Sequence, residues 1–147
     1  MLEKIFGPNE VTILINLALC LFAGLLIGFE RESRGKDAGI STHSLVILGS
    51  MLFTFLSINM DPSSPSRIAA QIVTGIGFLG AGLIIKEGGN VKNLTTAASI
   101  WFAAAIGMCF GFGFYVIGII ATLASFLIPR LPHLTRYHKR FALTYKK

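Results

Sequence analysis

The amino-acid sequence predicts an all-α polytopic membrane protein with five transmembrane helices. Only 14% of its 147 residues are charged, whereas a soluble domain carries about 25%. The mean hydropathy is +0.70, which places the chain in the membrane class. Sixteen glycines fit this class as well, because small residues allow close contacts between helices in lipid.

The helices are predicted from four uncharged stretches: Val11–Phe29, Ser44–Met60, Ile68–Ile85 and Thr95–Ile128. Each of the first three has the length of one bilayer crossing. The fourth would be about 51 Å long as one helix, which would require more tilt than is usual. Gly111 and Gly113 lie near its midpoint and permit a tight turn. We therefore expect helices over about 11–29, 44–60, 68–85, 95–110 and 114–128.

The basic residues predict the orientation of these helices. With five crossings, eleven of the thirteen Lys and Arg residues lie on one side, and only Lys4 and Arg67 lie on the other. With four crossings the division becomes five against eight. The positive-inside rule favours the first arrangement, with the N-terminus outside and the C-terminus in the cytoplasm. Residues 1–129 then form a transmembrane domain, and residues 130–147 form a basic cytoplasmic tail.

Several classes of function are disfavoured by the composition. The five predicted helices contain no charged residue, so a proton relay or a carboxylate-lined ion path lacks its groups. The chain offers neither paired aspartates nor a Ser–His arrangement inside the membrane, so we expect no enzyme. The Lys and Arg residues lie between apolar runs and indicate topology and lipid contact rather than nucleic-acid binding. Cys20 and Cys109 are expected as free, buried thiols.

The third predicted helix is rich in glycine. Residues Gly75 to Gly80 match G-x-G-x-x-G, but the strand and the acidic residue of a dinucleotide site are absent, so we reject that function. Because its residues are small on several faces, we expect this helix at the centre of the bundle. Packing alone is the simpler interpretation, and the alternative is a polar pocket against exposed backbone. The candidates for the central helix and the pocket are Asn16, Asp61, Arg67, Gln71, Thr74, Gly75, Gly77, Gly80 and Gly82.

Two G-x-x-x-G motifs predict contacts between helix pairs. They are Gly24 with Gly28 and Gly107 with Gly111. Either motif is suited to packing within the chain or to a dimer.

The densest polar cluster follows the first helix. It is interpreted either as a solvated loop that sets topology or as a functional site. Glu30 directly follows the apolar run, where an unpaired carboxylate is costly, and acids alternate with bases. The three histidines (His43, His133 and His138) lack metal-site spacing and are expected at the membrane interface. The candidates for a functional cluster are Glu30, Arg31, Glu32, Arg34, Lys36, Thr42 and His43.

A second polar group begins the fourth helix, at Asn93, Thr95, Thr96 and Trp101. The threonines are interpreted as N-capping residues and Trp101 as an interfacial anchor, with a functional role as the alternative.

These segments carry a resemblance to a known family. The sequence resembles the MgtC/SapB family, in its first half through Gly28-Phe-Glu-Arg-Glu32, Gly35-Lys36, Ala38-Gly39 and Thr42-His43. The second half is closer, in Asp61-Pro62, Arg67 to Gly82, Asn93 to Trp101 and Ala104 to Gly107. The resemblance covers about residues 11–129, and motifs of this length are specific.

The resemblance implies a bacterial inner-membrane protein with a five-helix domain. It also implies a role in growth under magnesium limitation and, in pathogens, in survival inside macrophages. The mechanisms proposed for the family are Mg²⁺ transport and modulation of the F-type ATP synthase. Many members carry a soluble C-terminal domain, and we expect this chain to be a short form without it or a truncated chain.

Two functions follow from these observations. The first is regulation, through binding of membrane proteins such as the F-type ATP synthase or through a homo-oligomer, with a dimer as the expected form. The alternative is a small carrier or channel for Mg²⁺ or another solute. Mg²⁺ sites use carboxylates, and every Asp and Glu lies outside the predicted helices. We therefore expect regulation, with no cofactor, and leave any Mg²⁺ site unassigned.

Overall fold

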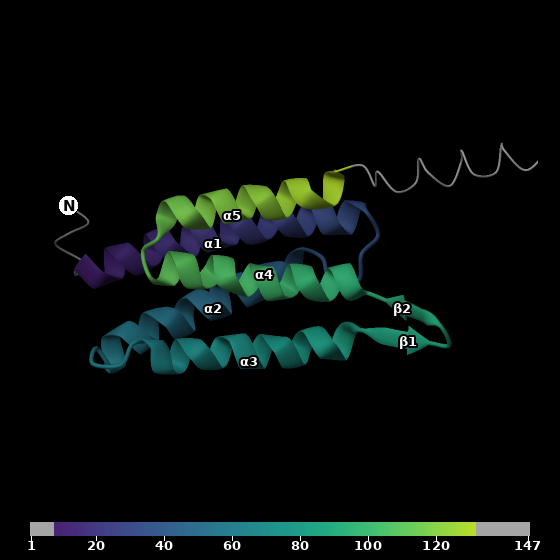
Figure 1. The fold of residues 1–147 in the computed structure, drawn as a ribbon. Helices are drawn as coiled ribbons and strands as arrows, with labels where there is room; N and C mark the ends of the chain where they lie inside the picture. Colours follow the sequence, from purple (N-terminus) through teal and green to yellow (C-terminus); the bar gives the residue numbers. More distant parts are fainter. Residues whose placement is uncertain (1–7, 132–147) are drawn as a thin grey trace, which may run out of the picture.

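The computed structural model describes residues 8–131 and contains five helices in up-and-down order, with one small hairpin (Figure 1). The five predicted helices are confirmed. In chain order the elements are α1 (Pro8–Ser33), α2 (Ile40–Met60), α3 (Ser66–Leu83), β1 (Ile85–Glu87), β2 (Asn90–Lys92), α4 (Leu94–Gly111), α5 (Tyr115–Leu127) and the 3₁₀ turn η2 (Ile128–Arg130).

Four of the described helices, α1 to α4, are long and apolar enough to cross a membrane, and α5 is a shorter apolar helix. The chain is therefore a multi-pass membrane protein. Several boundaries differ from the prediction by two to four residues, including the start of α2 at Ile40. Helix α1 continues to Ser33, so residues 30–33 are helical. Helix α3 ends at Leu83, and a two-stranded antiparallel hairpin replaces the predicted helix end and loop.

The turn between α4 and α5 confirms the prediction that the long apolar stretch divides into two helices. Gly113 has φ +77°, a left-handed conformation that side chains other than glycine rarely adopt. The tail residues 132–147, including His133 and His138, lie outside the described part of the chain.

Helices α1, α2 and α4 form the tightly packed part of the bundle. Both G-x-x-x-G motifs lie at contacts within the chain. A Cβ atom on Gly107 would lie 2.2 Å from the carbonyl oxygen of Ile47, a separation that the backbone cannot relieve by a side-chain rotation. The glycines and their neighbours on α2 are Gly24 with Ser44, Gly28 with Ile40, Gly107 with Ile47, and Gly111 with Thr54.

The apolar core lies between the same three helices. Its largest cluster includes Cys20, Ile27, Met51, Ile106 and Phe110. Both cysteines are free, and Cys20 is fully buried whereas its counterpart on α4 is half-buried. The prediction of free thiols is confirmed.

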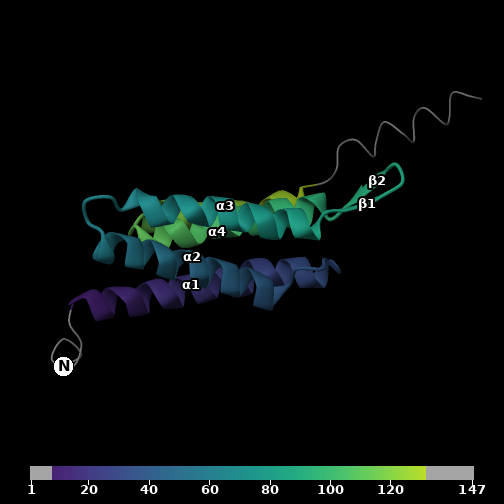
Figure 2. The ribbon, with the colours of Figure 1, turned by 90° about the horizontal axis from the view of Figure 1, so that it is seen from below.

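Helix α3 lies at the edge of the bundle, so its predicted central position is wrong (Figure 1). Only 17% of its span is buried, against 50% of the span of α4. It packs on α4 through Ile76, which forms a small apolar cluster with Ile100 and Ala104 of α4. In the view from below, α3 lies beside α4, with α1 on the opposite side of α2 (Figure 2). Small residues permit close approach, but here the close contacts are made by the glycines of α1 and α4.

Candidate functional site

A buried polar cluster lies where α1, α2 and α4 meet, at the end of the bundle that carries the hairpin. Glu30 is 1% exposed, Arg31 3%, His43 0% and Thr96 1%. The extra turn of α1 positions Glu30 and Arg31 between the helices, so the alternative of a solvated loop is wrong for these two residues. His43 lies inside the bundle, where α1 and α4 cover it.

Two basic residues surround the carboxylate of Glu30. The Nε atom of Arg34 lies 3.0 Å from Glu30 Oε1, as an ion pair one helical turn apart. Arg31 is the next residue in the chain, and its Nη2 donates a hydrogen bond of 3.4 Å to Thr96 Oγ1. Buried charges are tolerated only when they are paired or hydrogen-bonded. Arg31 therefore connects α1 to α4 and, with Arg34, balances the carboxylate.

His43 connects α2 to α4. Its Nδ1 lies 3.0 Å from the carbonyl oxygen of Gly39, which can only accept, so Nδ1 carries a hydrogen. Its Nε2 lies 3.2 Å from Ser99 Oγ, and this hydroxyl also lies 2.8 Å from the carbonyl oxygen of Thr96. A hydroxyl has one hydrogen, so with a neutral imidazole Ser99 connects α2 to α4 when it donates to Nε2, and bonds only within α4 when it donates to the carbonyl oxygen of Thr96.

Some buried atoms of this region have no hydrogen-bond partner among the described residues. They are both carboxylate oxygens of Glu30 (Oε1 is ion-paired with Arg34), Arg31 Nε and Ser44 Oγ at the cluster, and Asn16 Oδ1 further along α1. Each such atom costs about 1–3 kcal/mol. In a membrane protein, ionisable groups retained at that cost indicate a functional site. The polar cluster is therefore the first candidate site.

The start of α4 adds a contact to the loop between α1 and α2. Asn93 Nδ2 donates a hydrogen bond of 2.6 Å to Asp37 Oδ2, and Asn93 has φ +63°. Asn93 is the N-cap residue, so the predicted capping role of Thr95 and Thr96 is wrong: both lie inside the first turn. Trp101 is half exposed on the surface of α4.

The remaining predicted cluster residues lie at its margin. The carboxylate of Glu32 accepts a hydrogen bond of 3.4 Å from the backbone N–H of Ile40. Lys36 is exposed in the loop and Thr42 is half-buried on α2. The backbone N–H of Lys36 donates a hydrogen bond of 3.1 Å to the carbonyl oxygen of Arg31, but no side-chain hydrogen bond or ion pair among residues 8–131 joins Lys36 or Thr42 to the cluster. Within the same range, no three His, Cys, Asp or Glu side chains are grouped to hold a metal ion.

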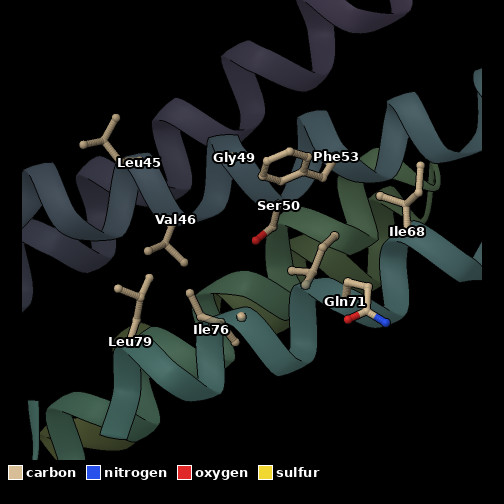
Figure 3. Close-up of a pocket in the computed structure, with 11 residues that line it drawn as sticks. Leu45, Val46, Gly49, Ser50, Phe53, Ile68, Gln71, Ile76 and Leu79 are labelled. Carbon is tan, nitrogen blue, oxygen red and sulfur yellow. The ribbon is translucent and has the colours of Figure 1, made fainter. Parts of the chain in front are cut away.

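The predicted pocket residues divide into separate places. A groove of about 560 Å³ lies between α2 and α3 (Figure 3). Gln71 and Gly75 line it, whereas Thr74, Gly77 and Gly82 do not. Its other walls are mostly apolar, so the predicted polar character is wrong. The lining residues are Leu45, Val46, Gly49, Ser50, Phe53, Ile68, Gln71, Ile72, Gly75, Ile76 and Leu79.

Asp61, Arg67 and Gly80 lie outside this groove. Asp61 Oδ2 and Arg67 Nη2 form an ion pair of 3.4 Å at the end of the bundle opposite the hairpin. A Cβ atom on Gly80 would lie 3.7 Å from the carbonyl oxygen of Ala97, so this glycine faces α4.

Three residues of the site were missed from the sequence: Asp37, Ser44 and Ser99. A signal for Ser99 was available, because it follows Thr96 by three residues and therefore shares its helix face. The pairing of Asp37 with Asn93 joins residues 56 positions apart, and no local pattern indicates it.

Comparison with known proteins identifies the family. A sequence profile of the MgtC family matches residues 17–137. The chain is 47% identical over 110 residues to "Protein MgtC" of Salmonella typhimurium (strain 14028s / SGSC 2262), covering 75% of this chain and 48% of that protein. It is 45% identical over 129 residues to the "Putative magnesium transporter YhiD" of Escherichia coli (strain K12), covering 82% and 60%.

A third relative, "Protein MgtC" of Brucella abortus (strain 2308), is 50% identical over 108 residues, which cover 73% of this chain and 45% of that protein. The chain thus spans about half the length of the curated relatives it matches. No solved structure matches it. The profile covers most of the chain, including the polar cluster, α3 and α4. The chain belongs to the MgtC family.

Proposed function

We propose that this chain is a regulatory protein of the bacterial inner membrane that binds membrane-protein partners, or a second copy of itself, through α3. One observation carries the proposal. Ala70, Thr74, Gly77 and Ala81 are all exposed and follow one another at helical spacing, so they form one stripe, here called the small face. No described helix covers it. A surface of this kind allows another helix backbone to approach closely.

The polarity of this surface supports the same function. Thr74, on the small face, is exposed on a helix that is apolar enough to span a membrane. A hydroxyl that faces lipid tails lacks partners, and a hydrogen bond to a neighbouring helix stabilises it. Gly77 has no atom within 4 Å of its Cβ position, so no described residue packs against it.

The biological setting of the proposal comes from the family. Two of the relatives carry the name MgtC, and the resemblance implies adaptation to growth at low magnesium, with a link to virulence in pathogens. We place the N-terminus outside and the hairpin end in the cytoplasm, because eleven of thirteen basic residues then lie inside. The proposed partners are the F-type ATP synthase and a second copy of the chain in a dimer.

Transport of Mg²⁺ is the alternative, favoured by the name of the relative YhiD. Mg²⁺ usually keeps several waters and binds one or two carboxylates. The buried carboxylate of Glu30 lies beside Arg31 and Arg34, and their positive charges oppose a divalent cation. A transport path would have to be built from uncharged groups such as Asn16, Gln71 and Thr74, repeated around an oligomer.

The proposal is tested by adding bulk to the small face. Gly77→Leu should insert and fold like the parent, because the Cβ position is open, but should lose complementation of a low-magnesium growth defect. A membrane protein that copurifies with the parent should be absent from preparations of Gly77→Leu. Val116→Phe adds bulk to an exposed position of α5 and should preserve both properties. Full complementation by Gly77→Leu would contradict the proposal.

Transport is tested separately in liposomes. The purified protein should give no Mg²⁺ uptake above that of empty vesicles. Saturable uptake that is lost in Gln71→Leu would establish the transporter instead.

A further inference from the structure

We propose that the groove between α2 and α3 binds one acyl chain of an anionic phospholipid whose headgroup lies at the hairpin end of the bundle. The groove is lined mostly by aliphatic and aromatic side chains (Figure 3). Gly49 on one wall and Gly75 on the other have no atom within 4 Å of a Cβ position. These two glycines therefore leave the space between the helices open.

The dimensions of the groove fit an acyl chain of one leaflet. Along α3 it extends from Ile68 to Leu79, a rise of about 16 Å, and the hydrocarbon of one leaflet is about 15 Å thick. On α3, the groove ends about 6 Å from Leu83 at the hairpin end and about 3 Å from Ser66 at the other end. Its position along the helix therefore suits either end, and the charges select the end for the headgroup.

The groove of about 560 Å³ is lined mostly by apolar side chains, and basic side chains lie near its hairpin end. Together they favour an acyl chain with an anionic headgroup over a helix of a partner or of a second copy. The small face, from Ala70 to Ala81, does not line the groove. Helix α3 therefore offers two separate surfaces, and the groove proposal stands independently of the proposed function.

The charges at the two ends of the groove specify the headgroup. Lys36 precedes α2, Lys86 follows α3, and neither side chain makes an ion pair or hydrogen bond with a described residue. The acidic groups nearby each have a partner: Glu32 with the N–H of Ile40, Asp37 with Asn93, and Glu87 with Lys92. At the opposite end, Asp61 and Arg67 neutralise each other. Among residues 8–131, unpaired positive charge thus flanks the groove only at the hairpin end, which favours an anionic headgroup there.

The experiment is native mass spectrometry of the full chain in detergent, titrated with dioleoyl phosphatidylglycerol or dioleoyl phosphatidylcholine. The parent should bind one phosphatidylglycerol saturably, about 30-fold more tightly than phosphatidylcholine if each lysine contributes as basic residues do near membranes. Gly49→Leu and Gly75→Leu fill the groove from opposite walls, and each should weaken binding of both lipids at least about tenfold.

Two controls separate the contribution of the groove from that of the lysines. Gly77→Leu adds the same bulk to α3 outside the groove and should bind lipid like the parent. The double variant Lys36→Ala/Lys86→Ala should bind phosphatidylglycerol no better than phosphatidylcholine. All variants keep the basic residues of the tail, so the tail cannot account for a difference between them.

Parent-like phosphatidylglycerol binding by both groove variants would overturn the proposal. A loss of dimer in Gly49→Leu with lipid binding unchanged would also overturn it, and would assign the groove to a second copy.

Discussion

The glycines of α1 and α4 lie against backbone atoms of α2, whereas those on the exposed side of α3 contact nothing in the described chain. Gly28 and Gly107 would each place a Cβ atom within 2.3 Å of a backbone atom. Gly75, Gly77 and Gly82 leave at least 4 Å of open space. The first group allows α1, α2 and α4 to form a stable bundle, and the second leaves α3 available to a partner.

The same division holds for the polar groups. At the hairpin end, Arg31 and His43 are buried and connect helices that pack closely. On α3, Gln71 and Thr74 are exposed to the surroundings of the bundle. Polar groups therefore stabilise the interior of the three-helix part, whereas on α3 they remain available for contacts with another molecule.

The largest effect is expected from Gly107→Leu. Any side chain here meets the carbonyl oxygen of Ile47, and the helices must separate, at a cost of at least about 3 kcal/mol. The protein should fail to yield a monodisperse folded species in detergent. Gly77→Leu, with open space at its Cβ position, should change thermal stability by less than about 0.5 kcal/mol. Equal losses in both variants would remove the distinction between the two groups of glycines.

The next effect is expected from Arg31→Leu. The variant leaves the buried Glu30 carboxylate with only one basic partner, Arg34, at a cost of about 3 kcal/mol. Replacing both charged groups, in Glu30→Leu/Arg31→Leu, should recover much of this loss, because no unbalanced charge then remains buried. Thermal unfolding in detergent measures both. A stability of Arg31→Leu equal to that of the exposed-loop control Lys36→Ala would contradict the account.

Ser99→Ala should have a moderate effect. It removes the hydroxyl between His43 and the carbonyl oxygen of Thr96, and a buried hydrogen bond contributes about 1 kcal/mol. Thr95→Ala changes an exposed position on the same helix and should leave the thermal midpoint unchanged. If the two variants have the same thermal midpoint, the hydrogen bond between α2 and α4 contributes nothing measurable to stability.

The smallest effect is expected from Arg67→Ala, at the start of α3. Its ion pair with Asp61 is exposed, and such pairs contribute about 0–1 kcal/mol. The loss should disappear at high salt, as unfolding measured in low and high sodium chloride would show. A salt-independent loss of about 3 kcal/mol would mean that α3 belongs to the rigid part of the bundle.

The sequence predicted the number and approximate bounds of the helices because length and hydropathy are local properties. The division of the last apolar stretch followed from Gly111 and Gly113, since the left-handed backbone of Gly113 is a local requirement. The polar cluster was also indicated, because Glu30 directly follows an apolar run.

The arrangement of the helices was harder to predict. Glycines show where a close contact is allowed and say nothing about which helix makes it, so α3 was expected at the centre. The contacts of Asn93 with Asp37 and of His43 with Ser99 each join residues 56 positions apart. Such pairs depend on the packing of whole helices, which the sequence pattern does not specify.

The central claim is that the small face of α3 contacts a partner inside the membrane. Photo-crosslinking in native membranes tests it most directly, with p-benzoylphenylalanine in place of Phe78, which is exposed beside the small face, or of Val116, which is exposed on α5. We expect a discrete protein adduct from position 78 and none from position 116. No adduct from position 78, or equal adducts from both positions, would contradict the claim.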